Sequence, residues 1–191
     1  MTGTPLIQGV ALGAARGERV LFRDVSVAAC AGDLILLRGL NGSGKTTLLR
    51  QLSGLAPPLA GQVERAAHHH WLGHANGLKA HETPRTHLAH WARVWGSAAP
   101  VANILSDMKL KRPADVPSRM LSAGQKRRTA IGRLKLVPRK VWLLDEPFNA
   151  LDTDGQTLLS EMIQAHRAEG GAVIAALHGD APVNASGEVV L

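Results

Sequence analysis

A glycine-rich stretch that ends in lysine and threonine carries the clearest chemical signal in this sequence. Gly39-Leu40-Asn41-Gly42-Ser43-Gly44-Lys45-Thr46 matches G-x-x-x-x-G-K-[ST], with an apolar run before it and helical spacing after it. Backbone N–H groups of such a loop turn inward around phosphate oxygens, and the helix N-terminus adds its positive dipole end. Lys45 is placed to reach the β- and γ-phosphates of a nucleotide, and the Thr46 hydroxyl to ligate Mg²⁺. The predicted phosphate-binding residues are Gly39, Asn41, Gly42, Ser43, Gly44, Lys45, Thr46 and Thr47.

The alternative reading of this stretch is a glycine-rich turn with a chance lysine. The strand-like run Leu34 to Arg38 and the helical segment from Thr46 to Ser53 flank the stretch as a phosphate loop requires, which disfavours that alternative. Gly54 then ends the helical segment as a C-terminal glycine does. The loop is therefore expected at the junction of a buried strand and a helix.

Two acidic residues follow a second apolar run. Val141-Trp142-Leu143-Leu144 precedes Asp145-Glu146-Pro147, and four apolar residues before an acid form the Walker B arrangement. A buried strand here would carry Asp145 to the carboxyl edge of the sheet, beside the phosphate loop. Asp145 is then expected to hold Mg²⁺ through water, and Glu146 to polarise an attacking water. A solvated turn after a strand is the alternative, and it is disfavoured because one site needs both motifs.

A third motif begins the basic segment that precedes the acidic pair. Leu121-Ser122-Ala123-Gly124-Gln125 resembles the LSGGQ signature of ABC-type ATPases, with alanine in place of the first glycine. Asn149-Ala150-Leu151-Asp152 resembles the D-loop of that family, and His178 follows the last buried strand as its switch histidine does. Five motifs occur in the family's order, so the chain is similar to ABC ATPases over most of its length.

This resemblance implies ATP and Mg²⁺ as cofactors and hydrolysis of ATP to ADP and phosphate. In the family, the signature helix presents its serine and backbone N–H groups to ATP held by a second copy, which implies a head-to-tail homodimer. Ser122 also suits an ordinary helix N-cap, and both roles are compatible. The implied roles are nucleotide binding for Ser122, Gly124 and Gln125, Mg²⁺ coordination for Thr46 and Asp145, and catalysis for Glu146 and His178.

One departure from the family concerns the glutamine that ABC ATPases carry between phosphate loop and signature. No glutamine occurs between Gln62 and Gln125 in this chain. The equivalent region is expected at residues 72–77, where His74 or Asn76 substitutes, or no residue does. The absence of this glutamine also leaves open an alternative function, in which the protein is a regulator that binds nucleotide and hardly hydrolyses it.

A second departure concerns the base of the nucleotide. The family stacks an aromatic side chain on adenine upstream of the phosphate loop, whereas this chain has no Tyr and residues 14–16 include no aromatic. Arg16 either stacks through its guanidinium plane or is a solvated arginine before a turn. Weak discrimination between ATP and GTP is therefore expected.

Finer features resemble the CcmA family, the ATP-binding subunits of the haem exporter of cytochrome c maturation. The partners implied are a membrane-spanning CcmB-like subunit, with CcmC, CcmD and CcmE-like proteins, at the cytoplasmic face of the bacterial inner membrane, where the chain is peripheral. ATP hydrolysis would be coupled to haem export or to release of the haem-loaded chaperone. The segments that carry this resemblance are residues 41–50, 72–74, 78–79, 121–125, 127–128, 145–148 and 150–152.

Two other functions compete with this reading. Another small ABC exporter would use the same motifs. A soluble ABC ATPase that acts on nucleic acid would suit the charge of +7, from 22 Lys+Arg against 15 Asp+Glu. Such proteins usually carry a coiled-coil insertion or two ATPase domains, and 191 residues leave no room for either. No nucleic-acid partner is therefore expected.

The elements that position these motifs are short apolar strands alternating with amphipathic helices, which predicts an α/β fold. We expect a P-loop NTPase, namely an ABC ATPase nucleotide-binding domain with a small antiparallel β subdomain and an α-helical signature subdomain at about 77–136. The 191 residues suit a single domain over 1–191. The single Cys30 excludes a disulfide framework. Predicted strands cover 6–12, 18–22, 24–29, 34–38, 62–65, 70–74, 140–144 and 172–177, and predicted helices cover 46–53, 84–107, 122–136 and 154–167.

Histidines and tryptophans gather in the middle of the chain. Seven of the nine His lie between His68 and His90, and His87 with His90 has the i, i+3 spacing of a metal pair. Packing or surface histidines are the default reading. Leu88, Trp91, Ala92 and Trp95 form one apolar helical stripe, which we assign to the core of the helical subdomain rather than to a docking surface.

Overall fold

The computed structural model describes residues 3–177, 179 and 182–191. The chain divides into two compact units, which we call the sheet unit and the helical unit. The sheet unit comprises Met1–Gly73, Arg139–Pro147 and Met162–Leu191, and the helical unit comprises His74–Pro138 and Phe148–Glu161. Within the part of the chain that is described, no helix has the length and apolar character needed to span a membrane.

A parallel sheet forms one layer of the sheet unit, with strand order β5-β6-β7-β3-β8. Its central strands β3, β6 and β7 are buried on both faces, as continuous apolar runs require. Since the strands run parallel, β3 and β6 end at the same edge of the sheet, which is where the two principal motifs follow them. The strands are β3 (Leu34–Arg38), β5 (His69–Leu72), β6 (Val141–Asp145), β7 (Ala172–Ala176) and β8 (Gly187–Val190).

An antiparallel sheet of β1 (Ile7–Arg16), β2 (Arg19–Ala29) and β4 (Ala60–Arg65) forms the second layer, in the order β2-β1-β4. The two strands predicted at 18–22 and 24–29 are one strand, so that prediction is wrong. The register between β1 and β2 shifts around Asp24, which has a φ of 54°, and such a bulge keeps the strand continuous while disturbing its alternation.

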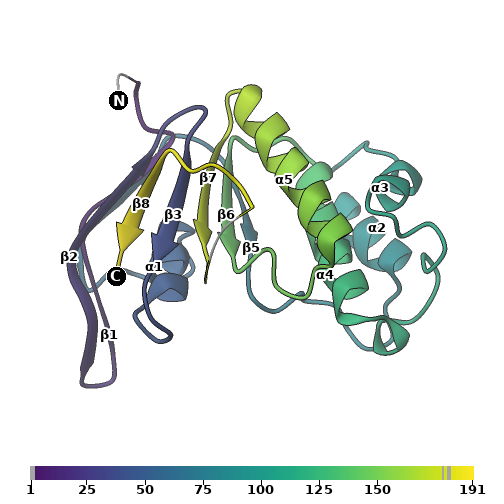
Figure 1. The fold of residues 1–191 in the computed structure, drawn as a ribbon, viewed down its shortest axis with the longest axis horizontal. Helices are drawn as coiled ribbons and strands as arrows, with labels where there is room; N and C mark the ends of the chain where they lie inside the picture. Colours follow the sequence, from purple (N-terminus) through teal and green to yellow (C-terminus); the bar gives the residue numbers. More distant parts are fainter. Residues whose placement is uncertain (1–2, 178, 180–181) are drawn as a thin grey trace. The chain divides into compact units, whose positions relative to one another are not determined.

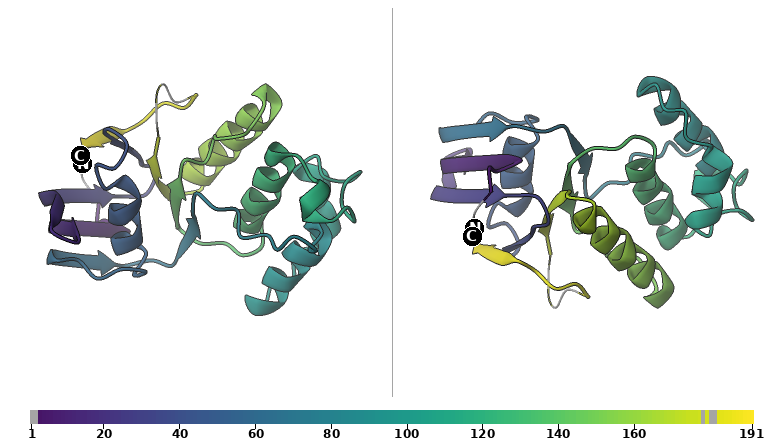
Figure 2. Two further views of the ribbon diagram at one scale, coloured as in Figure 1. Left: turned by 90° about the horizontal axis from the view of Figure 1, so that it is seen from below. Right: turned by 90° about the horizontal axis from the view of Figure 1, so that it is seen from above.

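Helix α1 (Lys45–Leu52) lies between the two sheets of this unit (Figures 1 and 2). Leu48, Leu49 and Leu52 are fully buried and share a core with residues from both layers, such as Leu12 of β1 and Ile174 of β7. Each fully buried leucine contributes about 1.5–3 kcal/mol through loss of water contact. The burial fixes α1, and with it the loop that leads into the helix.

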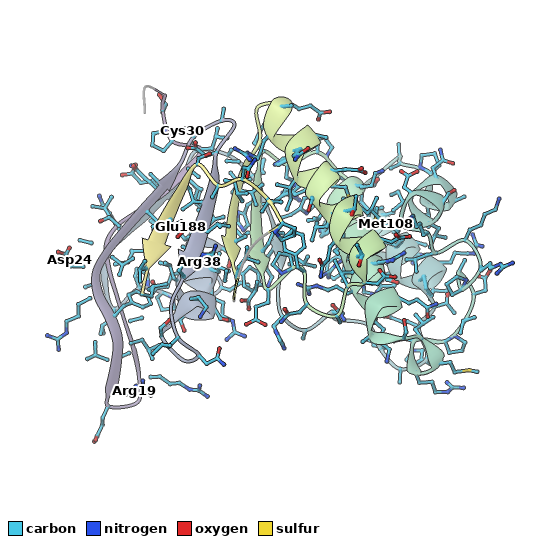
Figure 3. The ribbon with its side chains drawn as sticks, in the orientation of Figure 1. Arg19, Asp24, Cys30, Arg38, Met108 and Glu188 are labelled. Carbon is cyan, nitrogen blue, oxygen red and sulfur yellow. The ribbon has the colours of Figure 1, made fainter. Side chains whose placement is uncertain are left out.

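The last strand, β8, is absent from the sequence predictions because it is short and only half buried. It pairs in parallel with β3 at the edge of the sheet. The Arg38 guanidinium at the end of β3 donates through Nε and Nη2 to Glu188 Oε1, at 3.2 Å each, and the two side chains meet in Figure 3. Arg38 also donates to the carbonyl oxygen of Gly179. These bonds join the strand that precedes the phosphate loop to the C-terminal strand.

The helical unit contains α2 (Pro84–Val94), α3 (Val101–Asp107) and α4 (Ala123–Gly132), with 3₁₀ turns at Ser118–Met120 and Arg133–Lys135. Helix α5 (Thr153–Ala168) begins in this unit and continues into the sheet unit. Gly132 of α4 is tightly packed, because a Cβ there would lie 3.3–3.4 Å from atoms of Leu88, Ile104 and Met108. The three helices therefore form one core.

Two helices are shorter in the structure than the sequence predicts. The segment 84–107 breaks after Val94, since Gly96 has a φ of 63° and Pro100 begins α3 as its N-cap. The segment 122–136 is α-helical only to Gly132 and then tightens into a 3₁₀ turn. Thr83 is the N-cap of α2, and Pro84 occupies the first turn of the helix.

The tryptophan stripe of α2 belongs to the packing of the helical unit. Leu88 and Ala92 are buried, and the ring centroids of Trp91 and Trp95 lie 4.9 Å apart. The Arg133 guanidinium carbon lies 5.5 Å from the centroid of the Trp91 ring. These contacts favour the predicted core role of the stripe.

Candidate active site

A cavity of about 600 Å³ lies in the sheet unit at the N-terminus of α1. Residues from β1, β2, the loop before α1, α1 itself and the end of β6 line it. Its lining is Ala15, Arg16, Leu21, Asn41, Gly42, Gly44, Lys45, Thr46, Thr47, Arg50 and Glu146. Most of the predicted phosphate-binding residues thus surround one hollow.

The loop between β3 and α1 takes its shape from glycines in conformations that other residues rarely adopt. Gly39 has a φ of 138°, and a Cβ there would lie 2.5 Å from the carbonyl oxygen of Leu191. Gly44 has a φ of 111°, and its Cβ would lie 2.7 Å from the Phe22 ring. Gly44 supplies no side-chain cap, so the first N–H groups of α1 are left to a ligand.

Lys45 lies almost wholly inside this loop, and the residue is 6% exposed. Its Nζ donates to the carbonyl oxygens of Gly39 and Leu40, at 2.7 and 3.0 Å. Burial lowers the pKa of the Lys45 amino group, while the carboxylates of Glu146 and Asp145 act in the opposite direction. A buried cation of this kind is well suited to an anionic ligand.

The hydroxyl of Ser43 gives a second indication that a ligand belongs in the loop. Its Oγ is buried and has no hydrogen-bond partner among the described residues. A buried hydroxyl without a partner costs about 1–3 kcal/mol, which a phosphate oxygen would recover by accepting a hydrogen bond. The chemistry of the loop residues therefore suits a bound phosphate group.

Thr46 and Asp145 meet although 99 positions separate them in the sequence. The Thr46 Oγ1 donates to the Asp145 carboxylate, lying 3.1 Å from Oδ1 and 3.0 Å from Oδ2. Asp145 is 2% exposed at the end of β6. A hydroxyl and a carboxylate side by side are oxygen ligands of the kind that Mg²⁺ takes in proteins, so the pair fits that ion.

Glu146 leaves β6 in a conformation that is rare for a residue with a side chain. Its φ is 47°, and its backbone N–H donates to the carbonyl oxygen of Ala176 at 3.0 Å. Such a conformation costs about 1–3 kcal/mol and persists only where neighbouring structure enforces it. The turn brings the half-buried carboxylate into the cavity lining beside Lys45.

The signature residues begin α4 in the helical unit. Ser122 is the N-cap as predicted: its Oγ accepts from the Gln125 N–H at 3.1 Å, and Gln125 Oε1 accepts from the Ser122 N–H at 3.0 Å. A Cβ at Gly124 would lie 2.9 Å from the carbonyl oxygen of Ala150. Ala123 is exposed, so its methyl group is tolerated. The next residue, Gly124, has no room for a Cβ and must be glycine.

The D-loop lies against the signature helix within the helical unit. Arg128 of α4 forms an ion pair with Asp152, whose Oδ1 also accepts from the Gly155 N–H at 3.0 Å. The hydrogen bond from Arg128 holds the pKa of the Asp152 carboxyl below its usual range. Ala150 of the D-loop has a φ of 64°. The ion pair between Arg128 and Asp152 ties the start of α5 to the signature helix.

Some predicted residues are placed elsewhere or not described. His178 lies outside the described residues. Of the two candidates for the missing glutamine, His74 is exposed, whereas Asn76 Oδ1 accepts from Arg127 Nη1 at 3.2 Å. Arg127 of α4 is 2% exposed, so Asn76 is bonded to a buried residue of the signature helix.

The histidine pair of α2 does not converge. His87 is buried, and its Nδ1 lies 3.1 Å from Glu82 Oε2, while His90 is exposed. Burial lowers the pKa of the His87 imidazole. No group of three or more His, Cys, Asp or Glu able to hold a metal occurs within the described ranges.

Leu21 and Arg50 also line the cavity, and neither is among the predicted site residues. Arg50 follows Thr46 and Thr47 by four and three positions, so helical spacing places it on their face of α1. That spacing would have predicted Arg50. Leu21 depends on the pairing of β1 with β2, which no local pattern reveals.

The fold and the cavity together define the ATP-binding domain of an ABC transporter. The ABC transporter family profile matches residues 22–149. A solved ATP-binding subunit of an ABC transporter has the same fold, with a TM-score of 0.80 at 22% identity over 91% of this chain and 79% of that chain.

More specific relatives are named cytochrome c biogenesis ATP-binding export protein CcmA. The one from Hyphomonas neptunium is 54% identical over 187 residues, covering 98% of this chain and 97% of the relative. The one from Maricaulis maris is 41% identical over 90% of this chain and 84% of the relative. The chain belongs to the ABC transporter family and, within it, to the CcmA group, which confirms the resemblance and the fold class expected from the motifs.

Proposed function

We propose that this ABC ATPase hydrolyses ATP to power an exporter of c-type cytochrome biogenesis, and that haem delivery is the process it drives. The observation that carries the proposal is the convergence of Lys45, Thr46 and Glu146 on one cavity, in a chain 54% identical to a CcmA protein. The proposal assigns each of these side chains a part in the hydrolysis of the γ-phosphate.

The phosphate loop binds and orients the triphosphate. Lys45 donates to the β- and γ-phosphate oxygens, and the N–H groups at the start of α1, together with Asn41 and Thr47, surround the remaining oxygens. Thr46 and Asp145 are the residues that would hold Mg²⁺, an ion that offsets the charge of the phosphates when bound. The loop thereby fixes the γ-phosphorus for attack.

Glu146 is the general base of the proposed reaction. Its carboxylate accepts a proton from the attacking water, and the bond between the γ-phosphorus and the bridging oxygen breaks to release ADP. His178 is proposed to contact the γ-phosphate. Both assignments follow the family's motif order.

The signature completes the site from a second copy of the chain. We assign Ser122, Gly124 and Gln125 to the γ-phosphate of ATP held by the partner, in a head-to-tail homodimer. The whole chain, 1–191, is proposed to form one nucleotide-binding domain, with residues of about 77–136 as its signature subdomain. The D-loop pair Arg128 and Asp152 supports this, since it orients the signature helix.

The proposed partner is a membrane-spanning CcmB-like subunit, acting with CcmC, CcmD and CcmE-like proteins at the cytoplasmic face of the inner membrane. The names of the relatives, which describe ATP-binding export proteins of cytochrome c biogenesis, support this assignment. Haem export and release of the haem-loaded chaperone are the two forms that the coupled step can take.

Co-expression with the CcmB-like subunit tests this function. We expect the chain to sediment with membranes only when that subunit is present, and to restore holocytochrome c in a strain that lacks its own ATPase subunit. The Asp145→Asn variant should sediment equally but fail to restore haem attachment, because Mg²⁺ binding is impaired. Salt-sensitive DNA binding without membrane association would instead favour a nucleic-acid ATPase.

A further inference from the structure

We infer that Gln51, a buried glutamine near the end of α1, is a positioning residue for nucleotide binding. Its hydrogen bond to β1 sets where one wall of the cavity stands relative to the phosphate loop. The inference rests on the proposed function, since it concerns ATP bound in the same cavity. Gln51 is not among the described residues that line the cavity, so it acts through the strand to which it is bonded.

Gln51 occupies a position of α1 whose neighbours are apolar. It is 1% exposed, and Leu48, Leu49 and Leu52 of the same helix are fully buried. Its Nε2 donates to the carbonyl oxygen of Gly13 at 3.0 Å, whereas its Oε1 is buried and has no hydrogen-bond partner among the described residues. Because a buried acceptor without a partner lowers stability, an apolar side chain would suit this position better for stability alone. The glutamine is therefore best explained by the single bond that it makes.

The acceptor of this bond lies where β1 leaves its pairing with β4. Gly13 of β1 is opposite Ala60 of β4, and among the described strands the rest of β1 pairs with β2 alone. The register of β1 shifts next to Gly13 against both neighbouring strands, and such a bulge redirects the residues that follow it. The bond from Gln51 thus holds the base of the two-stranded hairpin in which β1 and β2 meet (Figure 1).

This hairpin supplies one wall of the cavity. Ala15 and Arg16 of β1 and Leu21 of β2 are lining residues, and we call these three the hairpin wall. Ala15 follows Gly13 by two positions along β1. A two-stranded hairpin has little stability of its own, so contacts at its base decide where the hairpin wall lies.

Helix α1 contacts the hairpin near both of its ends. At the start of the helix, the Phe22 ring packs so closely on the phosphate loop that a Cβ at Gly44 would lie 2.7 Å from it. Gln51 makes its bond to Gly13 seven residues later, about 10 Å along the axis at the usual rise per residue. One helix therefore fixes both the phosphate site and the hairpin wall before ligand binds. Such preorganisation raises affinity, because less freedom is lost on binding.

Calorimetric titration of the full-length protein with ATP and with inorganic triphosphate tests the inference. Gln51→Met keeps the length of the side chain and removes the donor, while the Gly13 carbonyl oxygen still accepts from the Leu59 N–H at 2.9 Å. One net hydrogen bond corresponds to a factor of about two to ten in affinity, so ATP should bind that much more weakly. Triphosphate binding should not change, because the phosphate loop is unaltered. The variant should unfold at the same or a higher temperature, since the unpartnered Oε1 is removed as well.

Two further measurements separate positioning from a general disturbance of the core. Steady-state hydrolysis by Gln51→Met should show a raised KM for ATP and an unaltered kcat, as expected when binding is lost equally from the ground state and the transition state. Gln51→Leu should behave in the same way. Leu49→Met is the matched control, because it places the same side chain at a neighbouring buried position of α1 with no hydrogen bond to lose. It should alter binding of neither ATP nor triphosphate.

Four results would overturn the inference. They are full ATP affinity in Gln51→Met, an equal loss of triphosphate binding in that variant, a lower unfolding temperature of both Gln51 variants, and an unmodified protein that binds ATP no more tightly than triphosphate. The second and third would show that Gln51 only supports the fold. Failure of the proposed function is distinguishable from all four, because the unmodified protein would then bind neither ATP nor triphosphate.

Discussion

Replacement of Lys45 by alanine is expected to abolish ATP hydrolysis and to weaken ATP binding by roughly a hundredfold or more. The Lys45 Nζ is the buried cation of the phosphate loop, and each hydrogen bond to a charged group contributes about 1.5–3 kcal/mol. Two such bonds to phosphate oxygens account for the expected loss. Calorimetric titration with ATP and a phosphate-release assay measure the two effects.

Thermal unfolding separates this effect from loss of the fold. Burial already disfavours the charged amino group, which has a lowered pKa, so Lys45→Ala should not unfold at a markedly lower temperature. ATP binding of unaltered affinity in a folded Lys45→Ala protein would contradict the assignment of the loop.

Replacement of Glu146 by glutamine is expected to lower ATP turnover by about 10²–10⁴-fold, the contribution typical of a general base. The amide cannot take the proton from water, whereas the phosphate loop is unchanged and ATP still binds. An ATP-bound dimer should therefore accumulate, visible by gel filtration in the presence of Mg²⁺ and ATP. Phosphate release gives the turnover.

A surface carboxylate provides the control for this substitution. Glu161 is exposed on α5 and distant in sequence from the motifs, so Glu161→Gln should leave turnover and the monomer–dimer balance unchanged. Unchanged turnover in Glu146→Gln would remove Glu146 from the mechanism.

The centre of the site follows from the sequence because its determinants are local or periodic. The glycines and Lys45 identify the phosphate loop. The two apolar runs that precede the loop and Asp145 predict parallel strands that end at the same edge of the sheet. That reasoning anticipates the contact of Thr46 with Asp145, which the structure places at 3.0 Å between Thr46 Oγ1 and Asp145 Oδ2. Ser122 is likewise recognisable as an N-cap from its place before a helical segment.

Features that depend on tertiary packing were beyond the sequence. Two strands are predicted on either side of Asp24, whereas the structure has the single strand β2 with a bulge there. The bulge arises from the register of β1 with β2. Strand β8 has four residues and exists because β3 offers it a partner. The bond between Asn76 and Arg127 connects positions 51 apart and could not be read from spacing. The role of His178 stays a prediction.

The lack of an aromatic at residues 14–16 shows how composition and structure combine. The absence of Tyr from the chain predicts both a missing stacking platform and weak discrimination between ATP and GTP. The structure adds that Arg16 and Arg50 both line the cavity at the start of α1, a placement that depends on tertiary packing.

Mixing two inactive variants measures most directly whether ATP is hydrolysed in a site shared by two copies. Lys45→Ala disables the phosphate loop, and Ser122→Arg blocks the signature. In a head-to-tail dimer of one copy of each, one site carries both defects and the other carries none. ATP hydrolysis should therefore reappear on mixing, up to about half the activity of the unmodified dimer per mixed pair. Absence of any hydrolysis in the mixture, with both variants folded and the mixed pair formed, would contradict the shared site.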